Sequence, residues 1–353
     1  RRDSMNQMLG IGSLCFSKAP FIMSTASVVG KKEGEGPLKH CFDVIGVDET
    51  FGEDNWEAAE SALQKEAFVL AINKCERKAK DIRYLFSGDL LGQMIASYFG
   101  LKDFEIPMFG LYGACSTCGE GLSLAAMTVA AGYADCVASV TSSHFASAEK
   151  QFRFPLEYAN QRPKSATWTV TGGAAFVLAS EERLKTWKQK PIAKITGITT
   201  GKVVDYGVRD SMNMGAAMAP AACDLIYQHF EDFKCIPEDY DRIITGDLGT
   251  VGKEILIDLL KKKGYDISKV HEDCGIEIFD GEKQGTGAGG SGCGCSAVTL
   301  SGHYLNEIQE GHMQKILFVP TGALLSPVSF NEGQTVPGIA HGIVIERVNE
   351  WNM

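Results

Sequence analysis

Cys115 is the residue best placed for covalent chemistry, because the sequence puts it at the start of a helix. It follows the apolar stretch 107–112 and precedes a run rich in Ala and Leu that ends near Gly132. A helix N-terminus favours negative charge, so a thiol there can have a lowered pKa and act as a nucleophile. The same pattern also fits a small buried residue at a tight strand-to-helix turn. Both interpretations stay open at this point.

The chain has eleven cysteines, and two further kinds of site would combine Cys115 with some of the others. The spacing Cys115-x-x-Cys118 suits a redox pair, although it lies deep inside a long chain. A zinc site would need four ligands, and the two halves of the chain offer Cys115, Cys118, Cys293 and Cys295. A Cys-x-Cys pair chelates poorly on a helix, because residues two apart do not share a face. We expect reduced thiols, no resident metal and no cofactor.

The segment 285–295 is unusually rich in glycine and leads into a further helical stretch. Glycines in such numbers indicate positive φ angles or a close approach of the backbone to another group. Exposed amides in such a loop can cradle a carboxylate. The segment lacks the Lys-Ser/Thr ending of a phosphate-binding loop, so a nucleotide is not indicated. A loop with close helix–sheet packing remains the alternative.

The elements that must position these residues occur twice along the chain. Residues 81–91 and 241–249 both read as apolar strands ending in Gly-Asp-Leu, and a cysteine-bearing helix start follows in each half. Each helix is followed by a second apolar strand and then by a closing strand rich in small residues. In the first half these strands are 136–141 and 172–178, and in the second half they are 315–320 and 341–346. This order predicts a duplicated α/β protein with mostly parallel sheets and helices on their faces.

The expected domains are an N-terminal half, 1–185, and a C-terminal half, 186–353. The charged segment 181–191, which ends in proline, marks the boundary. Two such halves leave a ligand site at their junction, near strand C-termini and helix N-termini.

Composition excludes several classes of protein. The net charge of −10 argues against a nucleic-acid partner, because phosphate contacts need a basic surface. The sequence has no run of 18 apolar residues, so we expect no transmembrane helix. Residues 1–10 lack the apolar region of a signal peptide.

Several motifs resemble the thiolase superfamily and, more narrowly, the stage V sporulation protein AD family of spore-forming Firmicutes. The superfamily features are Gly113-Ala-Cys115-Ser-Thr, the strand that begins at Thr171-Gly-Gly-Ala-Ala, and the layout in two halves. The narrower family is indicated by motifs that run through nearly the whole chain, namely residues 33–38, 87–91, 141–144, 148–155, 214–222, 289–293 and 321–327.

The resemblance implies a thiolase-like fold in which duplicated αβα halves form a five-layer αβαβα architecture. It also implies a protein that binds dipicolinic acid (pyridine-2,6-dicarboxylate), alone or as its calcium chelate, and helps to move it into the developing spore. Its implied partners are membrane proteins of the same operon. Its implied place is the periphery of the spore inner membrane, after synthesis in the forespore. The superfamily also allows a homodimer.

The resemblance to the enzymes of the superfamily breaks down around Cys115. Where condensing enzymes carry a histidine after the first strand of the second half, this chain has Asp247, and the Gly-rich stretch has Ser291 in place of a histidine or asparagine. A neighbouring carboxylate raises a thiol's pKa by like-charge repulsion. We therefore expect no enzymatic activity. The alternative is acyl transfer through Cys115, with His144 or His341 in the role of the missing base.

A binder of a flat dianion needs hydrogen-bond donors and needs no activated thiol. The candidate ligand-binding residues are Cys115, His144, Asp247, Ser291, Cys293, Ser326 and His341, with amides of the 287–294 loop. Phe145 or Tyr206 could stack on the pyridine ring, and calcium could bridge Asp247 to the ligand. Lys150 and Arg153 are expected on a solvated face. Residues 212–222 are expected to form a packed helix start, with a lid as the alternative.

Overall fold

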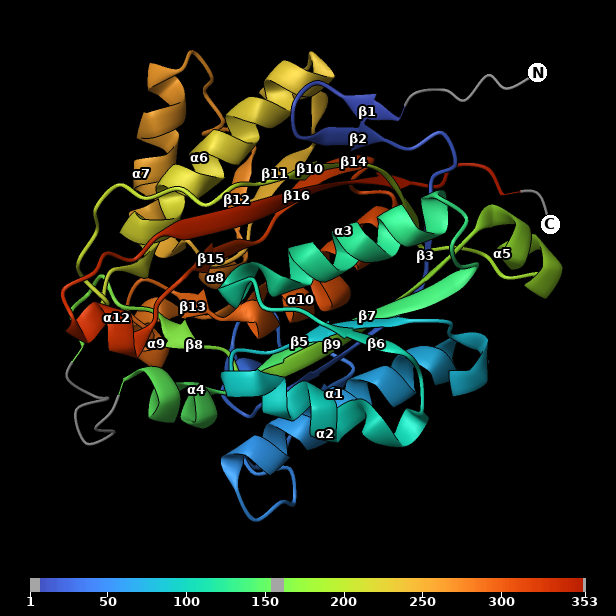
Figure 1. Ribbon diagram of the computed structural model, residues 1–353, viewed down its shortest axis with the longest axis horizontal. Helices are drawn as coiled ribbons and strands as arrows, with labels where there is room; N and C mark the ends of the chain where they lie inside the picture. Colours follow the sequence, from blue (N-terminus) through green and yellow to red (C-terminus); the bar gives the residue numbers. More distant parts are fainter. Residues whose placement is uncertain (1–6, 154–161, 352–353) are drawn as a thin grey trace.

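The computed structural model describes residues 7–153 and 162–351 and has five layers (Figure 1). Two layers are sheets, and three are helices. Helices α6 (Met214–Phe233) and α7 (Gly249–Lys262) cover the outer face of one sheet, and α1 (Trp56–Lys74) and α2 (Ile95–Leu101) cover the outer face of the other. Helices α3 (Thr117–Ala130) and α10 (Cys293–Thr299) lie between the sheets. The predicted five-layer α/β architecture is confirmed.

The two halves have the same strand order. In the first half the order is β6-β5-β7-β9-β3, and in the second it is β12-β11-β14-β16-β10. In each half three strands are parallel, and the two nearest the junction are antiparallel to their neighbours. The first set comprises β3 (Phe21–Val29), β5 (Leu85–Gly88), β6 (Met108–Gly110), β7 (Cys136–Ser143) and β9 (Gly172–Ala179); the second comprises β10 (Ala193–Thr200), β11 (Arg242–Thr245), β12 (His271–Asp273), β14 (Lys315–Val319) and β16 (Gly338–Arg347).

The two sheets join where β3 and β10 pair over two residues each, Phe21 with Lys194 and Ile22 with Ala193. One segment crosses between the halves. Strands β1 (Met8–Leu9) and β2 (Ser13–Cys15) pair with each other, and β2 pairs with β10 of the second half. Residues 8–15 therefore lie, in space, with the C-terminal half, which the sequence pattern did not indicate.

Burial explains the sequence pattern of the central strands. Every residue of β3, β7 and β9 is buried, because helices cover both faces of these strands. This is why they read as continuous apolar or small-residue runs and do not alternate. The predicted packing of residues 212–222 is also seen: from Ala217 to Cys223 every residue of α6 is buried.

The remaining elements connect these layers. They are β4 (Val44–Ile45), α4 (Phe145–Phe152), β8 (Trp168–Thr169), α5 (Glu181–Trp187), α8 (Cys274–Ile278), α9 (Gly281–Gln284), β13 (Gly290–Ser291), α11 (Leu305–Glu310), β15 (Thr321–Ala323) and α12 (Pro327–Asn331). Helix α10 continues through a π-helical turn, Leu300–Tyr304, into α11. Two pairs position the site: β13 pairs with β8, and β15 pairs with β16.

Candidate functional site

Cys115 lies in a short 3-10 turn, Ala114–Ser116, that leads directly into α3. The preceding Ala114 has a φ of 50°, which is the left-handed region that non-glycine residues rarely adopt. Two side-chain hydrogen bonds hold the turn: the Ser116 hydroxyl donates to Gly113 O at 2.6 Å and the Thr117 hydroxyl to Ala114 O at 2.7 Å. The predicted place of the thiol at a helix start is therefore correct, and the turn that presents it is strained.

A small pocket lies in front of this turn. Its volume is about 30 Å³, which is room for roughly two water molecules. It is lined by Leu90, Tyr112, Ala114, Cys115, Ala148, Phe152, Arg153, Thr169, Met214, Ser291, Gly292, Ala323 and Leu325. These residues come from both halves, so the pocket lies at their junction as predicted. Because the volume is this small, a ring-sized ligand enters only when some of the lining side chains move.

Asp247 lies beside the Cys115 thiol, and the two share a hydrogen bond. The carboxylate also accepts from the Thr321 hydroxyl at 2.8 Å and from the Gly292 amide at 3.0 Å. Burial raises the pKa of Asp247 to about 7. Burial first, and then the charge of Asp247, raise the pKa of the Cys115 thiol well above its ordinary value. The helix N-terminus therefore does not produce a reactive thiolate here.

None of the seven histidines, all within the described residues, lines the Cys115 pocket. His144 caps α4: its Nδ1 accepts from the Ala146 amide at 3.1 Å, and its Nε2 lies 2.7 Å from Glu49 O. Both ring nitrogens are thus engaged in structural bonds. His341, on β16, packs its Cβ near Gly119, one turn along α3 from the cysteine. Burial lowers the pKa of His341 to about 4, so the ring is neutral at pH 7.

Arg153 is the pocket residue that sequence reasoning missed. The expected solvated face is wrong for it, since its side chain is 11% exposed, whereas Lys150 is 57% exposed and fits the expectation. Arg153 forms an ion pair at 2.6 Å with Glu149, whose side chain is fully buried and also pairs with Arg162 at 2.8 Å. The buried Nε of Arg153 has no hydrogen-bond partner in the described structure.

Arg153 and Arg162 bring two positive charges to the single negative charge of Glu149. Burial lowers the pKa of Arg153, and the Glu149 charge opposes that effect. A guanidinium keeps its proton in proteins, so the pocket contains a cation with donors to spare. The sequence signal for it was the i, i+4 spacing of Glu149 and Arg153 on one helix face.

Of the remaining predicted residues, Ser291 and Cys293 lie at the pocket or next to Cys115, and Ser326 does not. Ser291 lines the pocket. Cys293 lies in an apolar cluster with Cys115, Leu90 and Ala148, and its thiol donates to Ser142 O at 3.0 Å. Ser326 is outside the pocket and exposed, and its hydroxyl caps α12 by accepting from the Ser329 amide at 3.3 Å.

The Gly-rich loop uses its amides within the protein. Gly292 N donates to Asp247, Gly294 N to Ser143 Oγ at 3.1 Å, and Ala288 N to Ala166 O at 2.8 Å. Its glycines permit contact: a Cβ at Gly294 would lie 2.4 Å from Gly172 O. The loop therefore fits the close-packing alternative, and these three amides are not available to a ligand.

The proposed aromatic residues also lie outside the pocket. Phe145 stacks on Trp168, with ring centroids 4.0 Å apart, and Arg162 lies over both rings. Tyr206 is 65% exposed. The eleven cysteines are free thiols. Within residues 7–153 and 162–351, the cysteines form no cluster close enough to hold a metal. Glu307, Glu310 and His312, of which Glu307 is half-buried and the other two are exposed, lie close enough together to do so.

A second buried polar network lies behind the pocket. Glu60, fully buried, accepts from the hydroxyls of Ser142 and Ser147 at 2.9 and 2.8 Å. Asp89 accepts from the Ser97 hydroxyl at 2.7 Å. Burial and the charge of Asp89 raise the pKa of Glu60 to about 8. Asp89 and Asp247 occupy matching positions after β5 and β11, so the duplication places a buried acid in each half.

Comparison with known proteins gives a consistent result. A sequence model of the family described as "Stage V sporulation protein AD (SpoVAD)" matches residues 10–346. The chain is 41% identical over 342 residues to "Stage V sporulation protein AD" of Bacillus subtilis (strain 168), covering 97% of this chain and 98% of that protein.

Solved structures of human mitochondrial 3-ketoacyl-CoA thiolase share the fold. The structure in complex with CoA has a TM-score of 0.56 at 13% identity and covers 95% of this chain and 99% of the thiolase. A second structure of the same enzyme gives 0.55 at 12% identity, covering 94% and 99%. At this identity the similarity establishes the fold alone.

Proposed function

The chain belongs to the stage V sporulation protein AD family, a family of sporulation proteins, and we propose that it binds dipicolinic acid in the Cys115 pocket without catalysing a reaction. In this proposal the protein serves the system that moves dipicolinate into the developing spore. The observation that carries the proposal is the largely buried Arg153 in a pocket that no histidine of the described residues lines.

Arg153 supplies the charge that an aromatic dicarboxylate needs. A carboxylate fits a guanidinium with two parallel hydrogen bonds, and burial strengthens such a pair. Its free Nε and its place in the pocket wall make it the first anchor for one carboxylate. Phe152, Met214 and Leu325 form apolar walls against which the pyridine ring would pack once they open. The second carboxylate would lie toward Cys115 and Ser291.

Asp247 would respond to such a ligand by taking up a proton. Its pKa, about 7, is already close to neutrality, and a nearby dianion favours the protonated form further. A calcium bridge through Asp247 is not part of the proposal, because Thr321, Gly292 and Cys115 already donate to its oxygens. Dipicolinate affinity should therefore fall as the pH rises above 7.

The absence of catalysis is proposed from the surroundings of Cys115. Acyl transfer needs a base to activate the thiol and donors to hold an oxyanion. Burial and then the charge of Asp247 raise the pKa of the thiol, and no histidine among the described residues lines its pocket. A thiol in this state is a weak nucleophile at neutral pH.

The proposed setting is the surface of the spore inner membrane, with membrane proteins of the same operon as partners and synthesis in the forespore. Among the described residues, no helix has the length and hydropathy that crossing a bilayer requires. A second copy of the chain is a further proposed partner.

Calorimetry with dipicolinate tests the function. The wild type should bind, and Arg153→Gln should lose about tenfold or more in affinity, since hydrogen bonds to a charged group contribute roughly 1.5–3 kcal/mol. Lys150→Gln is the matched control, because Lys150 lies on the same helix and points to solvent. Picolinate, with one carboxylate, should bind more weakly than dipicolinate.

Acyl transfer is tested in parallel. The protein is incubated with acetyl-CoA or malonyl-CoA, and intact mass reports an acylated cysteine. Acylation at Cys115 without dipicolinate binding would overturn the proposal and favour an acyl-transfer enzyme. Equal dipicolinate binding by the wild type and Arg153→Gln would support dipicolinate as the ligand but exclude the Cys115 pocket as its binding site.

A further inference from the structure

A second cavity, of about 290 Å³, lies away from the Cys115 pocket and shares no lining residue with it. Its walls come from β3, the last turn of α1, the loop before β10, and the helical segment that follows α10. Ser301 in this wall is eight residues beyond Cys293, which is roughly 12 Å along a helix. The cavity is therefore at the opposite end of the central helix from the proposed dipicolinate site.

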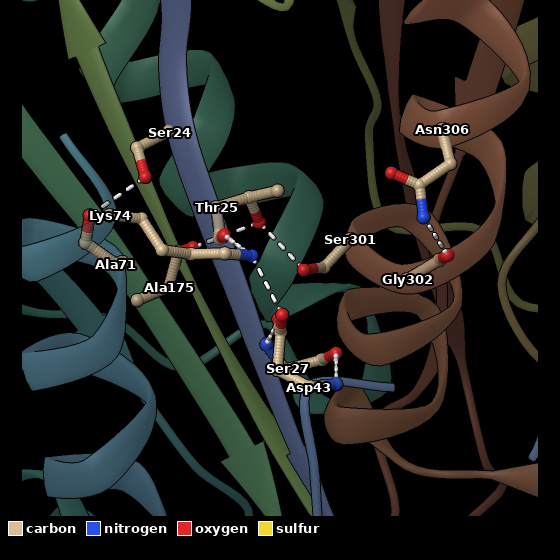
Figure 2. A network of polar contacts seen from close by, with 10 residues as sticks. All are labelled: Ser24, Thr25, Ser27, Asp43, Ala71, Lys74, Ala175, Ser301, Gly302 and Asn306. Atoms are coloured by element: carbon tan, nitrogen blue, oxygen red, sulfur yellow. Dashed lines mark hydrogen bonds and ion pairs between the residues drawn. The ribbon is translucent and has the colours of Figure 1, made fainter. Parts of the chain in front are cut away.

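Three hydroxyl groups form the base of the cavity. Ser24, Thr25 and Ser301 are 3%, 5% and 3% exposed. Figure 2 shows the contacts of Thr25 Oγ1 with Ala175 O and Ser301 Oγ. Their lengths are 3.0 and 2.7 Å. The threonine has a single hydrogen for these two contacts, so Ser301 retains either a hydrogen or a lone pair for a further partner. Ser301 also lies in the π-helical turn, a feature that often marks functional sites.

Two lysines give the cavity a positive charge. Lys74 donates to Asp43 Oδ1 at 2.7 Å and to Thr25 O at 2.9 Å, which leaves one of its three N–H groups (Figure 2). Lys190, an exposed lining residue just before β10, makes no ion pair with any residue of the described chain. With Asp43 as the acid in the lining, the cavity is positive by one charge, in a protein whose net charge is −10.

Amide side chains complete the lining. Asn306 Nδ2 donates to Gly302 O at 2.6 Å and leaves its Oδ1 as an acceptor (Figure 2). Gln189 and Gln309 have no side-chain hydrogen bond within residues 7–153 and 162–351. Amides and hydroxyls of this kind both donate and accept, so they match ligand hydroxyl groups, which do the same.

We propose that this cavity binds a small polyhydroxylated carboxylate of the sugar-acid class. The single negative charge of such a molecule balances the cavity's charge, with the carboxylate between Lys190 and Lys74. Its hydroxyls bond to Ser301 and to the amide side chains. The site is independent of dipicolinate binding, since no residue is common to the two pockets.

Cys41 lines the cavity and provides a readout at the site itself. Its alkylation by iodoacetamide is followed by peptide mass spectrometry, with gluconate, acetate or inorganic phosphate present at millimolar concentration. Gluconate should slow the alkylation of Cys41 and leave that of the exposed Cys15 unchanged. Calorimetry of gluconate gives the affinity.

Two variants and one control complete the test. Lys190→Gln should weaken gluconate binding about tenfold. Gln309→Trp, at the exposed rim, should block entry. Lys185→Gln should change nothing, because Lys185 lies outside the cavity and pairs with Glu181. If gluconate does not slow the alkylation of Cys41, or slows it equally in the wild type and Lys190→Gln, the proposed site is wrong. Equal protection by acetate and phosphate would overturn the ligand class.

Discussion

Replacing Asp247 by asparagine should change how the protein's stability depends on pH. Burial raises the pKa of this carboxyl from 3.8 to about 7, so the folded state holds a proton that the unfolded state releases between these two values. A raised acid pKa lowers the free energy of unfolding as the pH rises through that window, and the loss is complete above the folded-state pKa. A shift of this size corresponds to roughly 4 kcal/mol.

The asparagine variant lacks this titration. Its side chain keeps one acceptor oxygen for the Gly292 amide and places an NH2 group toward the Thr321 hydroxyl, so any cost of the exchange is the same at every pH. The unfolding free energy of the wild type minus that of Asp247→Asn should therefore fall by several kcal/mol from pH 4 to pH 8, and any cost that is the same at every pH cancels in this comparison.

Urea unfolding at one-unit steps from pH 4 to pH 8 measures the effect. Asp205→Asn is the control, because Asp205 is exposed and its hydrogen bond to Thr335 lowers its pKa, so it does not titrate in this range. Parallel profiles for the wild type and Asp247→Asn would refute the reasoning. They would mean that the carboxyl of Asp247 titrates near its ordinary pKa despite its burial.

Three further predictions concern residues of the site. His144→Ala should destabilise the protein by about 1–2 kcal/mol in urea unfolding, since the cap of α4 and the bond to Glu49 O are lost, and should leave dipicolinate affinity unchanged; weaker binding in folded protein would contradict its structural role. Gly294→Ala should destabilise by more than about 2 kcal/mol, because its Cβ meets Gly172 O at 2.4 Å; an unchanged urea midpoint would show that the loop adapts. Iodoacetamide should modify Cys115 more slowly at pH 7 than an unperturbed thiol in a model peptide; faster modification would indicate a thiolate.

The fold could be predicted from the sequence because its signals are local and repeated. The Gly-Asp-Leu strand ends and the cysteine-bearing helix starts recur in the same order, and the strand order of the two halves follows that repeat. The crossing of β1 and β2 into the second half could not be predicted, because two short strands carry no mark of the sheet that they join.

The site was predicted in part. Asp247 was expected beside Cys115 because it stands where the condensing enzymes of the superfamily carry a histidine, and the two residues do share a hydrogen bond. His144 and Ser326 were selected for their chemistry, yet the structure uses both as helix caps, a role that depends on which residue begins a helix.

What the sequence determined by itself is the repeated pattern of strands and helices, and with it the place of Cys115 at a helix start and of an acid opposite it. Only the tertiary structure decided the chemistry of that cysteine. Burial raises the pKa of the thiol and of Asp247 together, and burial depends on contacts between the two halves. The same holds for Arg153, whose charge lies in the pocket because α4 folds against β8. Pairwise spacing along a chain gives no measure of solvent exposure, and solvent exposure sets how strongly each charge acts.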